Sequence, residues 1–214
     1  MRSVSRGPAA PGARLVTARL SIEPLRRAHA RELHLALRAP RIFDYVSEGP
    51  TPSIRAMALR IQRRVRGPPA GSPEAWLNWV VRQRSSHRVV GSLQATVRAD
   101  RRRASVAYLF APKYWGRGYA AESLGAILAF LAERYGISTF QARVDARNDR
   151  SIRLLERLGF EIVRTVPHAE YLLGAWGDEH VFRLRTRARG PVARRARPDS
   201  ARGRRLRPPA AYGV

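Results

Sequence analysis

Apolar and polar residues alternate in short runs along the first half of the chain, and these runs predict strands. The runs occupy residues 15–22, 76–83, 88–97 and 106–110. The short polar link between the second and third runs is typical of a hairpin, so we expect those strands to pair antiparallel. Apolar residues at helical spacing predict helices over residues 24–38 and 53–65. Gly and Pro residues at 66–73 predict a loop.

A glycine-rich turn follows the fourth strand, which ends at Pro112. The next helix is predicted to start near Gly118 and to end at Gly136. It buries one apolar stripe formed by Leu124, Ile127, Leu128 and Leu131. A strand at residues 138–144 comes next. A strand, a helix and a strand within about 40 residues form a right-handed crossover, which makes the two strands parallel.

The last elements are a short helix and two strands. Asn148 or Asp149 is predicted to cap the helix, which ends at Gly159. The strands are expected at residues 160–166 and 180–185. The whole order predicts an α/β (α+β) fold, in which helices cover a mixed sheet.

Composition changes abruptly at both ends of the chain. Residues 1–13 and 186–214 are rich in Arg, Pro, Ala and Gly and lack apolar periodicity, so we predict two disordered tails around one domain at residues 14–185. The absence of Cys excludes disulfides, a catalytic thiol and thiolate metal sites, and no metal site is predicted. No apolar run reaches the roughly 20 residues of a membrane span, and no signal peptide is evident, so we expect a cytoplasmic protein without membrane contact.

The formal net charge of +25 raises the question of an anionic partner. Part of this charge falls in the tail, because residues 185–214 hold ten Arg against the single Asp199. Residues 14–184 hold 29 basic and 15 acidic residues, a balance of +14. Coding bias toward Arg and selection by a polyanion both explain this excess. A domain of this charge repels polycations unless it has an acidic cleft, and no such cleft is evident from the sequence.

The turn after Pro112 has the layout that a diphosphate needs. Gly116 and Gly118 let the backbone approach an anion, and the following helix directs its N-terminal amides and its dipole at the same place. The segment lacks the Gly-Lys-Ser/Thr ending of a nucleotide-binding P-loop. It also lacks the third Gly of a dinucleotide fold, since Ala121 stands at that position.

The segment after Tyr114 consists of Trp115, Gly116, Arg117, Gly118, Tyr119 and Ala120. This run resembles the acetyl-CoA motif of GNAT N-acetyltransferases. Trp115 departs from the usual Arg or Gln, as in the RimJ/RimL-like branch, which this run is most similar to. Further segments agree with that branch and stand in the same order: residues 17–20, residues 90–92, and Asn148 and Ser151 followed by residues 158–160.

This resemblance implies a mostly antiparallel sheet with a splayed parallel strand pair that admits the pantetheine arm of acetyl-CoA. The main chain of Leu109 and Phe110 would pair with that arm. Backbone amides of Gly116, Gly118 and Ala120 would hold the diphosphate. Asn148 and Ser151 would contact the cofactor, and Arg117, Arg150 or Arg153 would meet a phosphate. Helix capping alone is the alternative role for Asn148, and surface solvation is the alternative for each Arg.

The usual proton-transfer residues of such enzymes are missing. Ser105 stands where many relatives have an acidic residue, and Leu155 stands where some have Tyr. We therefore consider Ser105, Tyr108 and Glu122 as catalytic candidates. Glu48 and His87 are further candidates. The absent base fits an α-amine substrate, a base elsewhere in the chain, or a protein that only binds CoA.

The predicted function is acetyl transfer from acetyl-CoA to a primary amine, either a protein N-terminus or a small molecule. The amine attacks the thioester directly, and a backbone N–H near Leu109 or Phe110 stabilises the oxyanion. Residues 43–49, 76–79 and 171–177 are expected to line the acceptor pocket. The rival hypothesis is an RNA- or ribosome-associated protein that uses the Arg-rich tail. Both a monomer and a homodimer fit the sequence.

Overall fold

The strands of the described chain form one eight-stranded sheet in the order β1-β2-β3-β4-β5-β6-β8-β7. The computed structural model describes residues 13–100 and 102–186. Every neighbouring pair is antiparallel except β5 and β6, which are parallel. This confirms the mixed α/β fold and the crossover. The strands are β1 Leu15–Val16, β2 Leu20–Pro24, β3 Glu74–Gln83, β4 Val89–Arg98, β5 Arg103–Phe110, β6 Thr139–Asp145, β7 Glu161–Leu172 and β8 Ala175–Arg185.

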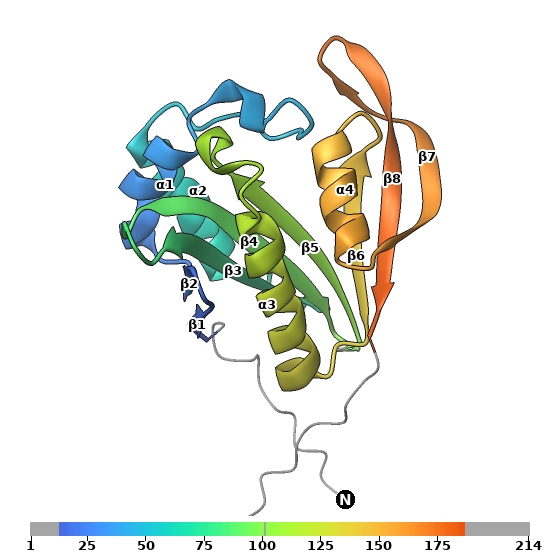
Figure 1. The fold of residues 1–214 in the computed structure, drawn as a ribbon, viewed down its shortest axis with the longest axis horizontal. Coiled ribbons are helices and arrows are strands. Elements are labelled where there is room, and N and C mark those ends of the chain that lie inside the picture. The colour runs from blue at the N-terminus through green and yellow to red at the C-terminus, as the bar shows by residue number, and fades with distance from the viewer. Residues whose placement is uncertain (1–12, 101, 187–214) are drawn as a thin grey trace, which may run out of the picture.

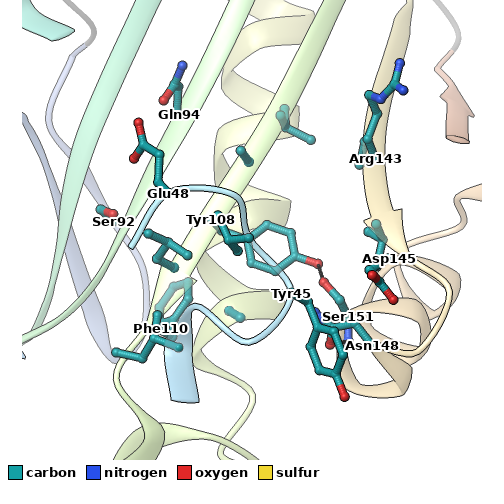
Figure 2. A pocket seen from close by; sticks show the side chains of 18 of the residues that line it. Tyr45, Glu48, Ser92, Gln94, Tyr108, Phe110, Arg143, Asp145, Asn148 and Ser151 are labelled. Atoms are coloured by element: carbon teal, nitrogen blue, oxygen red, sulfur yellow. Dashed lines mark hydrogen bonds between the residues drawn. The ribbon is translucent and has the colours of Figure 1, made fainter. Parts of the chain in front are cut away.

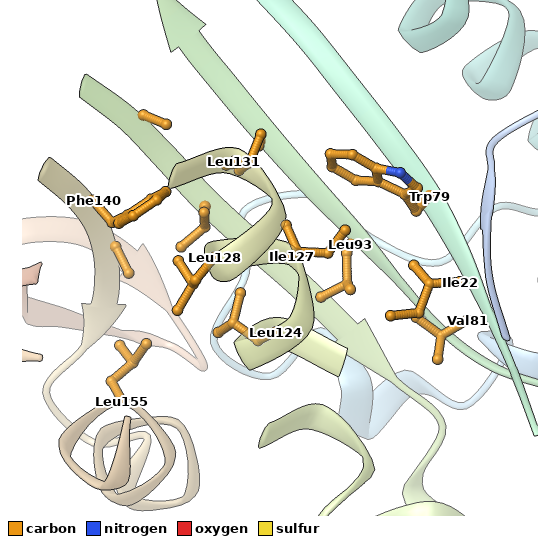
Figure 3. Packing of buried hydrophobic residues seen from close by; sticks show 14 of the residues in the cluster. Ile22, Trp79, Val81, Leu93, Leu124, Ile127, Leu128, Leu131, Phe140 and Leu155 are labelled. Atoms are coloured by element: carbon orange, nitrogen blue, oxygen red, sulfur yellow. The ribbon is translucent and has the colours of Figure 1, made fainter. Parts of the chain in front are cut away.

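Helices cover both faces of this sheet (Figure 1). The helix α3 Tyr119–Tyr135 and the shorter α4 Asp149–Arg157 lie on one face, while α1 Ala30–Ala36 and α2 Ile54–Arg66 lie on the other. The predicted apolar stripe of α3 is buried in the larger core, where Phe140 of β6 and Trp79 of β3 also pack (Figure 3). Residues of β3 alternate between the two cores, since Trp79 belongs to the α3 side and Val80 to the α1–α2 side.

The first predicted strand is interrupted, because the chain turns at residues 17–19. The backbone N–H of Thr17 bonds to the carbonyl of Leu20 at 2.9 Å, and Leu15 then pairs with Ile22 in a small hairpin. The predicted helix at 24–38 is also shorter, because Pro24 ends β2 and a 3-10 turn at Arg27–His29 precedes α1.

The last hairpin extends further than predicted. β7 and β8 remain paired out to Leu172 and Ala175, so residues 171–177 form a hairpin tip rather than a loop. The turn uses Leu173 and Gly174, both at positive φ, of 55° and 77°. A two-residue turn of this kind matches the twist of the flanking strands, but Leu at its first position carries no turn signal in the sequence.

Candidate active site

β5 and β6 separate after three paired residues and open a cavity in the sheet. Their parallel pairing covers Arg103 to Ser105 on β5 and Thr139 to Gln141 on β6. Beyond it the two strands diverge. Residues 106–110 and 142–145 line the opposite sides of a cavity of about 530 Å³. Cavities of about 300–1,000 Å³ are typical of small-molecule sites.

The free edge of β5 presents main-chain groups to this opening. The N–H of Ala111 bonds to the carbonyl of Val90 at 2.9 Å, which fixes which β5 residues face β4. In an antiparallel ladder the bonded residues alternate, so Leu109 also faces β4, whereas Tyr108 and Phe110 direct their backbone groups away from it. The Phe110 carbonyl accepts a hydrogen bond from Nε1 of Trp115 at 2.7 Å. The register therefore favours Phe110 over Leu109 as the main-chain donor to a ligand.

β4 can approach this part of β5 because Gly91 has no side chain. A Cβ at Gly91 would lie 2.4 Å from the Leu109 carbonyl oxygen and 2.7 Å from the Phe110 ring. The close approach holds the segment of β5 that lines the cavity against β4, which explains the Gly in the segment 90–92.

The glycine turn after β5 presents backbone N–H groups at the start of α3. Gly116 and Gly118 have φ of 72° and 76°, a region that favours glycine. Within the described chain the N–H groups of Gly116, Arg117 and Gly118 donate no hydrogen bond. The N–H of Glu122 bonds to Gly118 at 3.0 Å, so the amides before it lie in the unpaired first turn of the helix. Together these amides form an anion-binding turn.

Arg19 fixes this turn from the β1–β2 corner. Its Nη1 donates to the carbonyl of Arg117 at 2.9 Å, and its guanidinium lies 4.7 Å from the centre of the Tyr119 ring. Its Nε donates to Glu122 at 2.6 Å, and the hydroxyl of Thr17 donates to the same carboxylate at 2.5 Å. These contacts hold the start of α3 against the β1–β2 corner.

The pKa of Glu122 reflects this role. Burial raises it, but hydrogen bonds from Thr17 and from the backbone and side chain of Arg19 outweigh burial and leave the pKa below its ordinary value. The carboxylate is thus held ionised by its partners. Glu122 does not line the cavity.

A hydroxyl pair crosses from β5 to α4 inside the cavity. The phenol oxygen of Tyr108 lies 2.6 Å from Oγ of Ser151 (Figure 2). Asn148 positions Ser151 by capping α4, since its Oδ1 accepts a hydrogen bond from the Ser151 backbone N–H at 3.2 Å. Burial raises the pKa of Tyr108 to about 12, despite the opposing effect of the Ser151 hydrogen bond. Tyr108 therefore keeps its proton at neutral pH.

A cation lies beside the indole of Trp115. The guanidinium of Arg150, in the first turn of α4, is 3.8 Å from the centre of the ring, and both residues line the cavity. Arg117 is exposed and does not line the cavity. Arg153 is 64% exposed and pairs with Asp149 at 3.7 Å. Of the three Arg residues considered from the sequence, only Arg150 borders the cavity.

The other end of the cavity is lined by side chains from the loop before α2, from β4 and β6, and from the β7–β8 hairpin. Glu48 and Gln94 lie on one side of the cavity and Arg143 and Asp145 on the other, while Tyr45 lies beside Asn148 and Ser151 (Figure 2). Six carboxylates line the cavity: Asp44, Glu48, Asp145, Glu170, Asp178 and Glu179. Four Arg residues line the cavity as well, so the lining is acidic by a small margin, and the sequence alone does not make it evident. Strands far apart in sequence assemble it, so no local run of acidic residues reveals it.

A family model described as an acetyltransferase (GNAT) domain matches residues 19–161, more than half of the chain. This chain belongs to the GNAT acetyltransferase family. The match begins at Arg19, which fixes the glycine turn, and continues past α4.

Individual relatives are distant from this GNAT chain. It is 26% identical over 109 residues to an uncharacterized N-acetyltransferase of Bacillus subtilis, YoaA; that match spans 50% of this chain and 62% of YoaA, less than two thirds of the relative. RimL, the ribosomal L7/L12 alpha-N-protein acetyltransferase, solved with coenzyme A, superposes with a TM-score of 0.71 at 18% identity, covering 80% of this chain and 96% of RimL. A spermidine N-acetyltransferase from Vibrio cholerae, solved with CoA and spermine, gives 0.67 at 18% identity, covering 79% and 96%. These structures share the GNAT fold.

The GNAT domain places most of the sequence-predicted site residues together. The cavity is lined by Tyr108, Leu109, Phe110, Trp115, Ala120, Asn148 and Ser151. Gly116, Arg117 and Gly118 form the adjoining turn, and Tyr119 turns its side chain into the core, where its hydroxyl accepts a hydrogen bond from Gln83 at 2.9 Å. Asn148 both caps α4 and borders the cavity, so its two candidate roles are compatible.

Other candidates lie apart from the cavity. Ser105 is exposed on the last paired position of β5, and His87 is exposed in the β3–β4 turn. Of the residues predicted to line the acceptor pocket, the loop around Tyr45, the pair Asn78 and Trp79, and Gly177 line the cavity. The indole of Trp176 instead lies 60% exposed at the hairpin tip.

Sequence reasoning missed the polar side chains of β6 and of the last hairpin. Arg143, Asp145, Glu170 and Glu179 line the cavity, but none belongs to the acetyl-CoA motif. The available signal was the acidic residues that flank the hairpin tip, Glu170 on one side and Asp178 and Glu179 on the other. The described residues contain no group of three potential metal ligands and no helix long and apolar enough to cross a membrane.

Proposed function

We propose that this chain transfers an acetyl group from acetyl-CoA to a primary amine, either a protein N-terminus or a small-molecule amine. The observation that carries this proposal is the opening between β5 and β6, which ends at the unpaired amides that start α3. A thioester on a phosphate-bearing arm needs both features: an extended slot with main-chain partners, and an anion-binding turn. Family membership supports the same chemistry.

The residues present fit acetyl-CoA. The amides of Gly116, Gly118 and Ala120 would hold the diphosphate, and Arg150 would meet a phosphate beside Trp115. The free main-chain edge at Phe110 would pair with the pantetheine arm. Bound there, acetyl-CoA supplies an activated acetyl group.

The reaction requires a neutral amine, a donor for the oxyanion and a proton for the leaving thiolate. The backbone N–H of Phe110, directed away from β4, would stabilise the oxyanion. The Tyr108–Ser151 pair would protonate the thiolate, because Tyr108 keeps its proton and lies in hydrogen-bond contact with Ser151. The proton lost by the acetylated nitrogen would then restore the proton of the pair. We assign no such role to Glu122 or Ser105, since neither lines the cavity.

Amine-dependent release of CoA tests the proposal. The full chain is incubated with acetyl-CoA and one of two sets of acceptors, peptides with free N-termini or small primary amines. Free thiol and the acetylated product are then measured. We expect thiol and acetylated amine to appear in equal amounts with at least one set. A folded chain that releases no thiol with either set would contradict the proposal.

The rival function, RNA or ribosome binding by the Arg-rich tail, stays a prediction, because residues 187–214 lie outside the described chain. The cytoplasmic location, the two disordered tails and the choice between monomer and homodimer likewise stay predictions.

A further inference from the structure

The lining of the cavity reverses the charge balance of the chain, because it holds six acidic residues and four Arg. The folded segment 14–184 carries 29 basic and 15 acidic residues. Six of the 16 acidic residues of the chain line the cavity described above. Coding bias toward Arg adds positive charge over the whole surface, so it does not explain why carboxylates collect at the acceptor opening.

Three of these carboxylates have cationic partners within the protein. Glu48 pairs with Arg64 at 2.8 Å, and Asp145 pairs with Arg147 at 2.6 Å. Nε of Arg143 donates to Glu179 at 2.7 Å. Two of the Arg residues that line the cavity, Arg64 and Arg143, are therefore neutralised, whereas Arg41 also lines it and forms no ion pair among the described residues.

Two carboxylates on different elements have no such partner. Among the described residues, the side chains of Asp44, in the loop before α2, and Glu170, in β7, form no ion pair or hydrogen bond. Both side chains are half-buried, and both line the cavity. Glu170 also lies near Arg143, whose charge is already held by Glu179. A half-buried carboxylate without a partner favours a cationic ligand.

An uncharged side chain in the lining of the cavity also offers a hydrogen-bond acceptor to a cationic ligand. Oδ1 of Asn78 is buried and has no hydrogen-bond donor in the described structure, while the amide nitrogen of the same side chain donates to the Arg64 carbonyl at 3.2 Å. Asn78 lines the cavity. The end of the cavity where the amine would bind, the acceptor end, thus contains two carboxylates and one amide oxygen without partners. These groups suit a ligand that carries several N–H donors.

We propose that the acceptor is a small oligoamine, a molecule with at least one further cationic group besides the amine that is acetylated, and that Asp44 and Glu170 hold that further group. This inference rests on the proposed function and narrows it to one substrate class. A second cation on the same molecule also disfavours protonation of the reacting amine, because like charges repel. The acceptor then reaches its neutral, nucleophilic form more readily than an isolated alkylamine.

Acceptors that differ only in their cationic groups test the proposal. Butylamine, putrescine and spermidine are compared with aminobutyrate in the full chain with saturating acetyl-CoA, and kcat/KM is measured from thiol release. We expect kcat/KM to rise about fivefold for each added cationic group, as for a partly exposed ion pair, and to be lowest for aminobutyrate. Raising the ionic strength should raise KM for spermidine.

Equal kcat/KM for butylamine and spermidine, or preference for peptide N-termini over all small amines, would overturn the oligoamine proposal while leaving acetyl transfer intact. No turnover with any amine or peptide would instead remove the proposed function, and this inference with it.

Two variants test the named residues. Asp44→Asn and Glu170→Gln should each raise KM for spermidine about fivefold and leave KM for butylamine unchanged. Glu156→Gln is the matched control, because Glu156 is exposed on α4 and does not line the cavity. Titration with acetyl-CoA shows that each variant is folded. An unchanged spermidine KM in both variants, or an equal rise for butylamine, would refute the assignment.

Discussion

The two ends of the cavity are built in different ways. The cofactor end, where we propose that acetyl-CoA binds, consists mainly of backbone. It is formed by the free edge of β5, the glycine turn and the first turn of α3, which are contiguous in sequence from residue 106 to residue 122. The acceptor end consists of side chains from the loop before α2, from β6 and from the β7–β8 hairpin. Backbone geometry suits a ligand that every member of the family shares, whereas side chains on loops and hairpins are free to differ.

Charge follows the same division. The cofactor end presents amides and Arg150, which suit an anion, while the acceptor end presents carboxylates, which suit a cation. Substitutions at the two ends should therefore change different constants: the affinity for acetyl-CoA at one end and the KM of the acceptor at the other.

The largest effect is expected from Gly118→Glu. A carboxylate in the anion-binding turn should weaken acetyl-CoA binding at least about 100-fold, because like charges brought into contact cost several kcal/mol. Isothermal titration measures the affinity. Gly136→Glu is the control, since Gly136 has a similar φ of 71° at the other end of α3 and nothing within 4 Å of its Cβ position. Equal loss of affinity in both variants would mean that backbone strain, not the diphosphate site, is responsible.

Tyr108→Phe should lower kcat by about 100-fold while leaving acetyl-CoA affinity nearly unchanged, because it removes a general acid. The pKa of Tyr108, raised to about 12, keeps the wild-type acid protonated, so its titration should not lower kcat below about pH 10. Steady-state rates over a pH series measure both. Tyr171→Phe, at the exposed hairpin tip, should retain full activity. A Tyr108→Phe variant with wild-type kcat would exclude this residue from the chemistry.

Arg150→Ala should weaken acetyl-CoA binding about fivefold, as expected for a cation held over an aromatic ring beside a phosphate. The KM of the acceptor should not change. Arg153→Ala is the comparison, because Arg153 is exposed and does not line the cavity. If the acceptor KM changed instead of the acetyl-CoA affinity, the division between the two ends would be wrong.

The smallest effect is expected from Glu122→Gln. It should lower the free energy of unfolding by about 1 kcal/mol, which corresponds to a fall of roughly 2–4 °C in Tm, and leave kcat unchanged. The pKa of Glu122 is lowered in the folded chain, so its contribution is present above its ordinary pKa of 4.5 and is lost as pH falls through the lower folded value. Thermal unfolding at neutral and acid pH measures this. A large loss of kcat in folded Glu122→Gln would restore Glu122 as a catalytic candidate.

The sequence predicted the glycine turn and the helix after it because their signals are local. Two glycines after a strand and an apolar stripe at helical spacing lie within one short segment, and Gly118 and Gly136 mark both ends of α3. The contact that fixes this turn was not predictable in the same way, since Thr17 and Glu122 are 105 residues apart. Nothing in the sequence near Glu122 distinguishes a structural carboxylate from a catalytic one.

Most of the side chains that line the acceptor end could not be predicted from the sequence. The loop around Tyr45 was expected to line it, but the acidic lining depends on β6 pairing with β8, which places Asp145 opposite Glu179. It depends equally on the extended hairpin, whose turn at Leu173 has no typical turn residue at its first position. Long-range pairing brings these carboxylates together, so a count of charges along the chain does not reveal them.

Direct attack of the amine on acetyl-CoA is the central claim, and a single-turnover experiment tests it most directly. The full chain, in excess over acetyl-CoA, is mixed with spermidine or with buffer, quenched over time, and examined by mass spectrometry of both the protein and the small molecules. The account predicts acetylated spermidine in an amount equal to the CoA released, and no acetylated protein in either mixture. An acetyl group that appears on the protein first, or CoA released without any acetylated amine, would contradict it.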